Sequence, residues 1–188
     1  MYASNCIKNG LRRLRGVLCI KRQHDDALGL LCGNPGKLLF DALHAVAHRP
    51  GLDEFVAEHL LQALRGAGFR RIVTVFGCGG NRDRLKRPLM GEAVARLSDT
   101  AVLTSDNPRF EDPEAIISDV LPGLKGAKEL VVDPDRRSAT AKACAMLGPD
   151  DCLLIAGKGH EDYQIVNGVK HHYSDQEVVR DILGADGE

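Results

Sequence analysis

Apolar and polar positions follow one another in blocks that predict helices and strands in turn. Residues 52–64 carry apolar side chains at helical spacing, and Gly66 and Gly68 end that pattern. The segment 72–76 is β-branched and almost wholly apolar, which is typical of a strand covered on both faces. This part of the chain is therefore expected to form a helix followed by a buried strand.

The same alternation continues along the chain. Asp112, Pro113 and Glu114 provide an N-cap, a proline at the first helical position and an acid in the first turn, so a helix is expected to begin there. Strands that alternate with helices are typical of βαβ crossovers and a parallel sheet. The other expected elements are helices at 88–97 and 138–147 and strands at 101–104, 130–132 and 152–156.

The C-terminal part has a different pattern. Asn167 and Gly168 lie between two short apolar segments, which is a strong signal for a β-hairpin. Residues 174–177 have the spacing of a capping box, and a last helix is expected to follow them to about residue 183. The predicted fold is an α/β three-layer domain with a mostly parallel sheet, a C-terminal hairpin and a helix.

Residues 1–45 show no comparable periodicity, and glycines interrupt every apolar run. We leave this segment as an unassigned N-terminal extension or linker. It carries six Lys and Arg residues before its first acid, Asp25. A transit peptide is expected to be Ser-rich and amphipathic, and this stretch is neither, so we interpret it as a solvated basic arm.

Composition argues against several classes of function. The 188 residues carry 25 Lys and Arg against 26 Asp and Glu, a net charge of −1, whereas nucleic-acid binders usually have a basic excess. No apolar run approaches the roughly 20 residues that span a bilayer. The six cysteines include no CxxC pair, which zinc and redox sites need. We therefore expect a cytoplasmic protein with buried thiols, no metal centre, and no nucleic-acid or membrane partner.

Three polar loops follow predicted strands, at the ends where ligands collect in open α/β sheets. The first, residues 77–83, has three glycines that let the backbone approach a ligand and unpaired amides that favour anions. Its Arg82 has a planar guanidinium suited to a carboxylate or phosphate. A plain βα turn is the alternative interpretation of this loop.

The second loop, residues 105–109, contains Asp106, Asn107, Pro108 and Arg109. Its turn-forming residues are expected to hold Asp106 and Arg109 as an opposite-charge pair. Such a pair suits a zwitterionic amino acid, whose carboxylate meets the arginine and whose ammonium meets the aspartate. A solvated turn is the alternative.

The third loop, residues 156–163, places Lys158, His160, Glu161 and Asp162 beside two glycines. Our preferred interpretation is that Glu161 anchors an ammonium group. General acid–base work by His160 stays open, whereas a His–Glu pair without a third ligand makes a poor zinc site. His171 and His172 are expected to be exposed on the hairpin.

Together these loops closely resemble the C-terminal domain of the Mur ligases, and within that family the branch that adds meso-diaminopimelate in peptidoglycan synthesis. The similarity runs over about residues 72–183, with a fainter match at 47–50. It is carried by Val75-Phe76-Gly77-Cys78-Gly79-Gly80, Arg82-Asp83, Lys86-Arg87-Pro88-Leu89-Met90-Gly91, Asp106-Asn107-Pro108-Arg109 and Gly157-Lys158-Gly159-His160-Glu161-Asp162-Tyr163-Gln164.

The resemblance implies a Rossmann-like fold for residues 46–188 and a site for the incoming amino acid. Arg109 is implied to face the distal carboxylate of diaminopimelate, which lysine lacks. His48 is implied as a candidate on the nucleotide side, and no catalytic residue is identified. The residues implied to bind meso-diaminopimelate are Arg82, Asp106, Asn107, Pro108, Arg109, Gly157 and Glu161.

The family implies ATP and Mg²⁺, with an acyl phosphate attacked by the incoming amine. No GxxxxGK[ST] loop precedes residue 72, Asn81 replaces the usual acid before Arg82, and Leu85 replaces a usual glycine. Positioning an amine against an unactivated carboxylate leaves the barrier largely intact, so we expect the chain alone not to be a competent ligase. A separate chain carrying the ATPase and UDP-sugar domains is one expectation. A non-catalytic amino-acid-binding module and a degenerate fragment are the alternatives.

Overall fold

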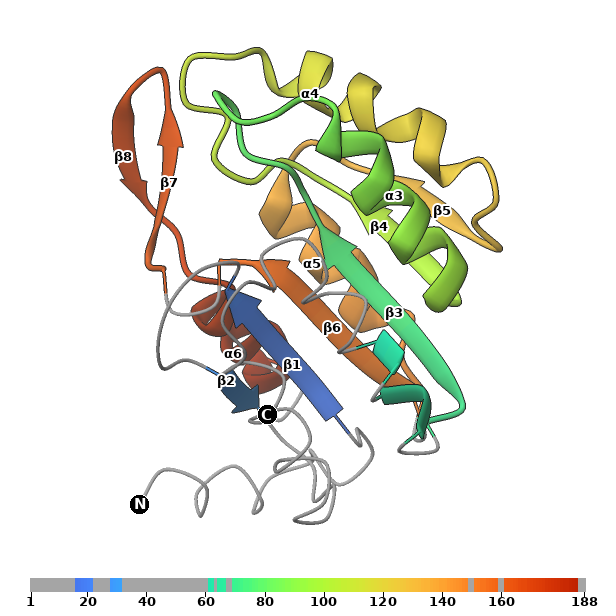
Figure 1. The fold of residues 1–188 in the computed structure, drawn as a ribbon. Coiled ribbons are helices and arrows are strands. Elements are labelled where there is room, and N and C mark those ends of the chain that lie inside the picture. Colours follow the sequence, from blue (N-terminus) through green and yellow to red (C-terminus); the bar gives the residue numbers. More distant parts are fainter. Residues whose placement is uncertain are drawn as a thin grey trace.

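Six strands form one twisted sheet in the order β2-β1-β6-β3-β4-β5 (Figure 1). The computed structural model describes residues 16–21, 28–31, 61–62, 64–66, 69–148, 151–158 and 161–185. All neighbouring strands run parallel except β1 and β2, which are antiparallel. The strands are β1 (Gly16–Lys21), β2 (Leu28–Leu31), β3 (Arg71–Phe76), β4 (Thr100–Leu103), β5 (Leu130–Val132) and β6 (Asp151–Gly157).

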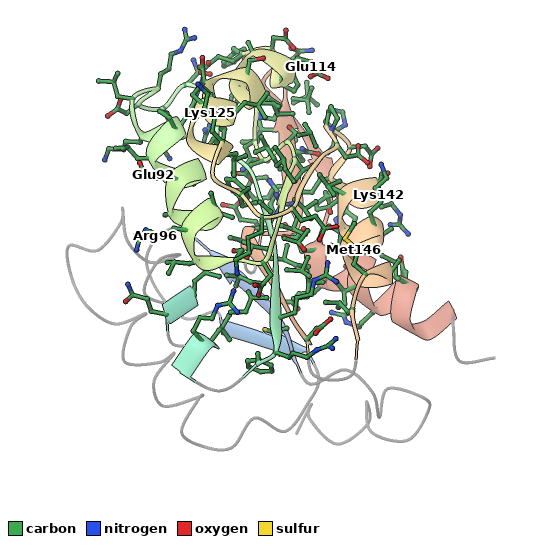
Figure 2. All side chains as sticks on the ribbon, turned by 90° about the vertical axis from the view of Figure 1, so that its right-hand side faces the viewer. Glu92, Arg96, Glu114, Lys125, Lys142 and Met146 are labelled. Atoms are coloured by element: carbon green, nitrogen blue, oxygen red, sulfur yellow. The ribbon has the colours of Figure 1, made fainter. Side chains whose placement is uncertain are left out.

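Helices cover both faces of the sheet. On one face, α3 (Lys86–Leu97), α4 (Pro113–Val120) and the 3₁₀ helix η2 (Leu121–Leu124) bury an apolar cluster that includes Phe76 and Leu103. On the other, α5 (Arg136–Ala145) and α6 (Asp175–Ala185) pack on a second cluster. Figure 2 shows the layers edge-on, with the labelled side chains of α3 and α5 on opposite sides of the sheet. The predicted three-layer α/β fold is therefore confirmed.

Local signals explain where several elements begin. The Asp112 side chain accepts a hydrogen bond from the Glu114 N–H at 3.1 Å and starts α4 as expected. Asp135 caps α5 in the same way, accepting from the Ser138 N–H at 2.7 Å, so α5 begins two residues before the predicted 138.

The C-terminal hairpin is also confirmed. It consists of β7 (Tyr163–Val166) and β8 (Val169–His172), and both turn residues, Asn167 and Gly168, have positive φ, at 50° and 77°. This conformation is the one that Asn-Gly turns favour in two-residue hairpin loops. The hairpin stands off the sheet near the carboxyl ends of its strands, at the upper left of Figure 1.

The N-terminal segment contains structure that the sequence did not predict. β1 and β2 lie within residues 1–45, and β1 pairs in parallel with β6 along its length. The boundary at residue 46 stays a prediction. Of the helix expected at 52–64, residues 61, 62 and 64 are helical, and the rest lies outside the described residues; the helix continues through 65 and 66.

The sheet order places a switch point between β3 and β6. The chain moves outward from β3 to β4 and β5, and α5 then returns it to β6 on the other side of β3. Ligands in open α/β sheets bind beyond the carboxyl ends of strands at such a point. The loops that follow β3, β4 and β6 are the three polar loops singled out from the sequence.

In the described part of the chain, no helix is long and apolar enough to cross a membrane.

Candidate functional site

A buried lysine joins the loop after β4 to the loop after β6. Lys158 is fully buried, and its Nζ donates a hydrogen bond to Asn107 Oδ1 at 2.6 Å. The same Nζ lies 3.0 Å from Asp106 Oδ1 and 3.9 Å from Glu161 Oε2. Burial lowers the pKa of Lys158, an effect that Asp106 opposes and the neighbouring Arg136 reinforces. One cation therefore faces two carboxylates.

Asn107 is held in one orientation by its partners. Its Oδ1 accepts from both Lys158 Nζ and the Ile165 N–H, the latter at 2.9 Å. Because two donors fix the oxygen, the amide nitrogen points the other way and donates to Glu161 Oε2 at 3.2 Å. Gln164 adds a further link by donating to the Asp106 carbonyl at 2.6 Å. These bonds tie the Asp106–Asn107 turn to the hairpin and to Glu161.

Arg109 projects from a backbone with φ of 57°, in the left-handed region. Its N–H donates to the Ile165 carbonyl at 3.0 Å, and its carbonyl accepts from the Gly168 N–H at 3.3 Å, so the hairpin holds this conformation. Its Nη1 donates to the Gly80 carbonyl at 2.5 Å. Among the described residues, Nε and Nη2 of Arg109 have no partner, which leaves donors for a ligand.

The expected ion pair between Asp106 and Arg109 is wrong. Asp106 pairs with Lys158, and Arg109 instead contacts the loop of residues 77–83, called the glycine loop below. The reason is that the turn projects the two side chains toward different neighbouring loops. Charges of both signs nonetheless lie in the Asp106–Arg109 turn.

Glycines let the first loop pack directly on the second. The Gly80 N–H donates to the Asn107 carbonyl at 2.8 Å, and a Cβ at Gly80 would lie 1.9 Å from the Pro108 carbonyl oxygen. A Cβ at Gly79 would lie 2.9 Å from Nη1 of Arg109. The amides of Gly80 and Asn81 are thus already bonded, to Asn107 and Glu111, and at these two positions the expectation of unpaired amides is wrong.

A buried arginine supports the glycine loop from below. Arg87 of α3 donates from Nη2 to both oxygens of Glu111 at 2.9 Å and from Nη1 to Asp119 at 2.8 Å. Glu111 in turn accepts from the Asn81 N–H. The hydrogen bonds from Asn81 and Arg87 lower the pKa of Glu111. Arg87 therefore fixes the loop through Glu111.

A second buried arginine lies beneath the loops that follow β4 and β6. Arg136, at the start of α5, pairs with Asp175, and both side chains are fully buried. Its Nη1 and Nη2 also donate to the Ser105 carbonyl at 3.4 Å and the Ala156 carbonyl at 3.0 Å. Burial disfavours its charge, but Asp175 outweighs this and raises the pKa of Arg136. Gly157, with φ of 127°, packs against this guanidinium.

The structure brings most of the predicted site residues together. Asp106, Asn107, Glu161 and Gly157 surround Lys158 and Arg136, with Pro108 buried in the same turn. Arg82 is exposed and has no hydrogen bond or ion pair in the described part of the chain. His48 and His160 lie outside the described residues. His171 and His172 are exposed as expected, and a hydrogen bond to Glu177 raises the pKa of His172.

Sequence reasoning assigned no role to Gln164, Arg87 or Arg136, and it noted Lys158 only as one of several polar residues. A lysine between two glycines and an arginine in the first turn of a helix are ordinarily solvated, so no signal marked them as buried. The general expectation of buried thiols is confirmed at Cys78. Cys144 and Cys152 are buried too, which raises the pKa of their thiols to about 11 and about 12. Among the described residues, no group of three or more His, Cys, Asp or Glu side chains could hold a metal ion.

Comparison with known proteins agrees with the resemblance seen in the loops. Residues 44–159 match the family model described as "Mur ligase, glutamate ligase domain". The chain is 54% identical over 162 residues to a UDP-N-acetylmuramoyl-L-alanyl-D-glutamate–2,6-diaminopimelate ligase of Lawsonia intracellularis, covering 82% of this chain and 33% of that protein. The ligase of that name from Aquifex aeolicus is 45% identical over 167 residues, covering 84% and 33%.

A solved structure of a ligase with the same name superposes with a TM-score of 0.67 at 40% identity, covering 71% of this chain and 28% of that one. The chain thus spans about a third of the length of the curated relatives it matches. The family model covers more than half of the 188 residues. The chain belongs to the Mur ligase family and contains the domain that this model describes.

Proposed function

We propose that residues 46–188 form the amino-acid-binding domain of a ligase that adds meso-diaminopimelate to UDP-MurNAc-L-Ala-D-Glu. The observation that carries this proposal is the arrangement around Lys158. Asn107 bonds to both Lys158 and Glu161, and so joins the loop that carries the Glu161 carboxylate to the loop that carries the Arg109 guanidinium. The names of the relatives support the same substrate. The proposed ligand residues are Arg82, Asp106, Asn107, Pro108, Arg109, Gly157 and Glu161.

The charges of the site favour a zwitterionic ligand. Lys158 Nζ lies 3.0 Å from Asp106 and 3.9 Å from Glu161, so two carboxylates lie on this part of the site and favour an ammonium group. Among the described residues, the Arg109 side chain bonds only through Nη1, to the Gly80 carbonyl, and its remaining donors suit a carboxylate, with exposed Arg82 on the adjoining loop. meso-Diaminopimelate differs from lysine by a carboxylate on its distal carbon. Arg109 therefore supplies a physical basis for selecting it over lysine.

In this proposal the chain binds and orients the incoming amine. Glu161 holds an ammonium group, Arg109 holds a carboxylate, and the rigid Asn107 turn fixes their separation. In this family, ATP with Mg²⁺ supplies activation of the acceptor carboxyl group, and the described residues do not themselves fit a Mg²⁺ site. Because the sequence contains no GxxxxGK[ST] loop, we expect the 188-residue chain to bind the amino acid without forming the amide. That other segments or a partner chain activate the acceptor carboxyl group stays a prediction. The cytoplasmic location of the chain stays a prediction too.

An NMR titration of the purified chain with meso-diaminopimelate tests this function. The expected result is saturable shifts at Arg82, Arg109 and Glu161 at up to millimolar ligand. Lysine, as the control ligand, should bind more weakly because it lacks the carboxylate that Arg109 contacts. A folded sample whose spectrum meso-diaminopimelate leaves unchanged contradicts the proposal.

Replacing Gly79 by alanine should reduce selectivity without unfolding the chain. The new Cβ would lie 2.9 Å from Nη1 of Arg109, so the flexible guanidinium has to move while the backbone stays. We expect a several-fold loss of the preference for meso-diaminopimelate over lysine, measured by the same titration. Gly126→Ala is the matched control, because no atom lies within 4 Å of a Cβ built there. Equal preference in the two variants contradicts the expected displacement of Arg109.

A further inference from the structure

We propose that Lys158 is the positioning residue of the amino-acid site, holding Asn107 and Glu161 in the geometry that receives the ligand's ammonium group. This inference deepens the function proposed above and rests on it. Lys158 itself is fully buried, so it acts on the ligand through these neighbours rather than by contact.

Geometry gives Lys158 a central place between two loops. It directly follows β6 and lies three residues before Glu161, whereas Asp106 and Asn107 belong to the loop after β4. Backbone hydrogen bonds join the loop after β4 to the hairpin at Arg109, through Ile165 and Gly168. Nearer to Glu161, the 2.6 Å contact of the Lys158 ammonium with Asn107 and its 3.0 Å approach to Asp106 add charge-assisted interactions between the two loops.

Lys158 also determines which end of the Asn107 amide faces the site. Two donors, Lys158 Nζ and the Ile165 N–H, occupy Oδ1, so Nδ2 is left to donate to Glu161. Without the ammonium, Oδ1 keeps one donor, and the amide gains freedom to rotate away from Glu161. The Glu161 carboxylate then loses the Asn107 donor and the nearby charge together.

The charge of Lys158 also sets what the site accepts. Asp106 and Glu161 face one ammonium, and the second buried cation nearby, Arg136, is paired with Asp175. Lys158 therefore sets how much negative charge the two carboxylates present to a ligand. A neutral residue at 158 would leave two carboxylates repelling one another, and Glu161 would move toward solvent.

The variant Lys158→Met tests this role, because methionine matches the lysine side chain as far as Cε and removes the ammonium. We expect affinity for meso-diaminopimelate to fall about tenfold or more, since hydrogen bonds to charged groups contribute roughly that much. The preference over lysine should stay the same, because both ligands share the ammonium end. Lys128→Met is the matched control, since Lys128 pairs with Asp99, which directly precedes β4 at the amino ends of the strands, away from the site. The proposal is overturned if Lys158→Met binds as tightly as this control.

A ligand-free measurement separates this inference from the proposed function. In the wild-type chain we expect a slowly exchanging Lys158 ammonium signal with contacts to Asn107, and an Asn107 side-chain amide signal with contacts to Glu161. Lys158→Met should shift that amide signal and remove its contacts to Glu161. If meso-diaminopimelate fails to bind but these signals behave as described, the proposed function fails and the positioning role stands. If the wild-type signals lack these contacts, the positioning role is overturned, even where the variant does not fold.

Discussion

Replacing Arg136 by methionine should lower the free energy of unfolding by about 3–5 kcal/mol, because it strips a buried carboxylate of its partner. Arg136 and Asp175 are both fully buried and joined at 2.8 Å. Methionine also removes the donors to the Ser105 and Ala156 carbonyls, at the ends of β4 and β6. Urea unfolding followed by circular dichroism measures the loss.

The neighbouring residue provides the control for this prediction. Arg137 pairs with Asp181 at 3.0 Å, but both side chains are about 60% exposed, and exposed pairs contribute less than about 1 kcal/mol. Arg137→Met should therefore change stability little. The double variant Arg136→Met/Asp175→Leu should recover most of the loss, since replacing both members of a buried ion pair by apolar groups is often neutral. Equal destabilisation by Arg136→Met and Arg137→Met contradicts the structural role of the buried pair.

The elements that sequence reasoning predicted are those whose local signals agree with the fold. The strand at 130–132 coincides with β5, and Asp112 and the Asn167-Gly168 turn act as their residue types predict. β1 and β2 gave no such signal. They are short apolar runs with Gly16 and Gly29 in them, and periodicity alone does not distinguish such runs from loops. The place of β1 is set by pairing with β6, which lies far away in the sequence, and β2 in turn pairs with β1.

For the candidate site, sequence indicated the loops but not what holds them. Gly, Asp, Asn and Arg after three strands predicted a ligand site at the sheet edge, and the topology does bring these loops together. The partners of Asp106 and Arg109 depend on how close neighbouring loops approach, so the predicted pair between them was wrong. The contact between Arg136 and Asp175 joins residues 39 positions apart, which no local pattern encodes.

Three buried cationic side chains hold the loops of the site in place. Arg87 secures the glycine loop through Glu111, Arg136 binds the strand ends, and Lys158 orients Asn107. Buried charges are costly unless they are well paired, so these side chains favour one arrangement of the loops over others. A ligand that enters such a site spends little free energy on ordering it, which raises affinity.

Replacing Arg109 by alanine should abolish the preference for meso-diaminopimelate over lysine. Losing one partner of a hydrogen-bonded charge pair costs about 2–5 kcal/mol, so affinity for diaminopimelate should fall roughly thirtyfold or more. Lysine has no distal carboxylate, and its affinity should hardly change. The substitution isolates the side chain, because the bonds of Arg109 to Ile165 and Gly168 are made by its backbone. Because alanine and arginine both carry a Cβ, the substitution does not change the steric cost of the backbone φ of 57°.

Two further variants make the Arg109 result specific. Arg109→Lys should remain poor, because an ammonium is a point charge and does not copy the fork of donors that matches a carboxylate. Arg180→Ala, at an exposed position of α6, removes an arginine away from the site and should leave both affinities unchanged. The measurement is the ratio of the two dissociation constants from NMR titration of each variant. If Arg109→Ala keeps the wild-type ratio, discrimination arises elsewhere, and exposed Arg82 becomes the residue to replace next, since its guanidinium has no partner in the described part of the chain.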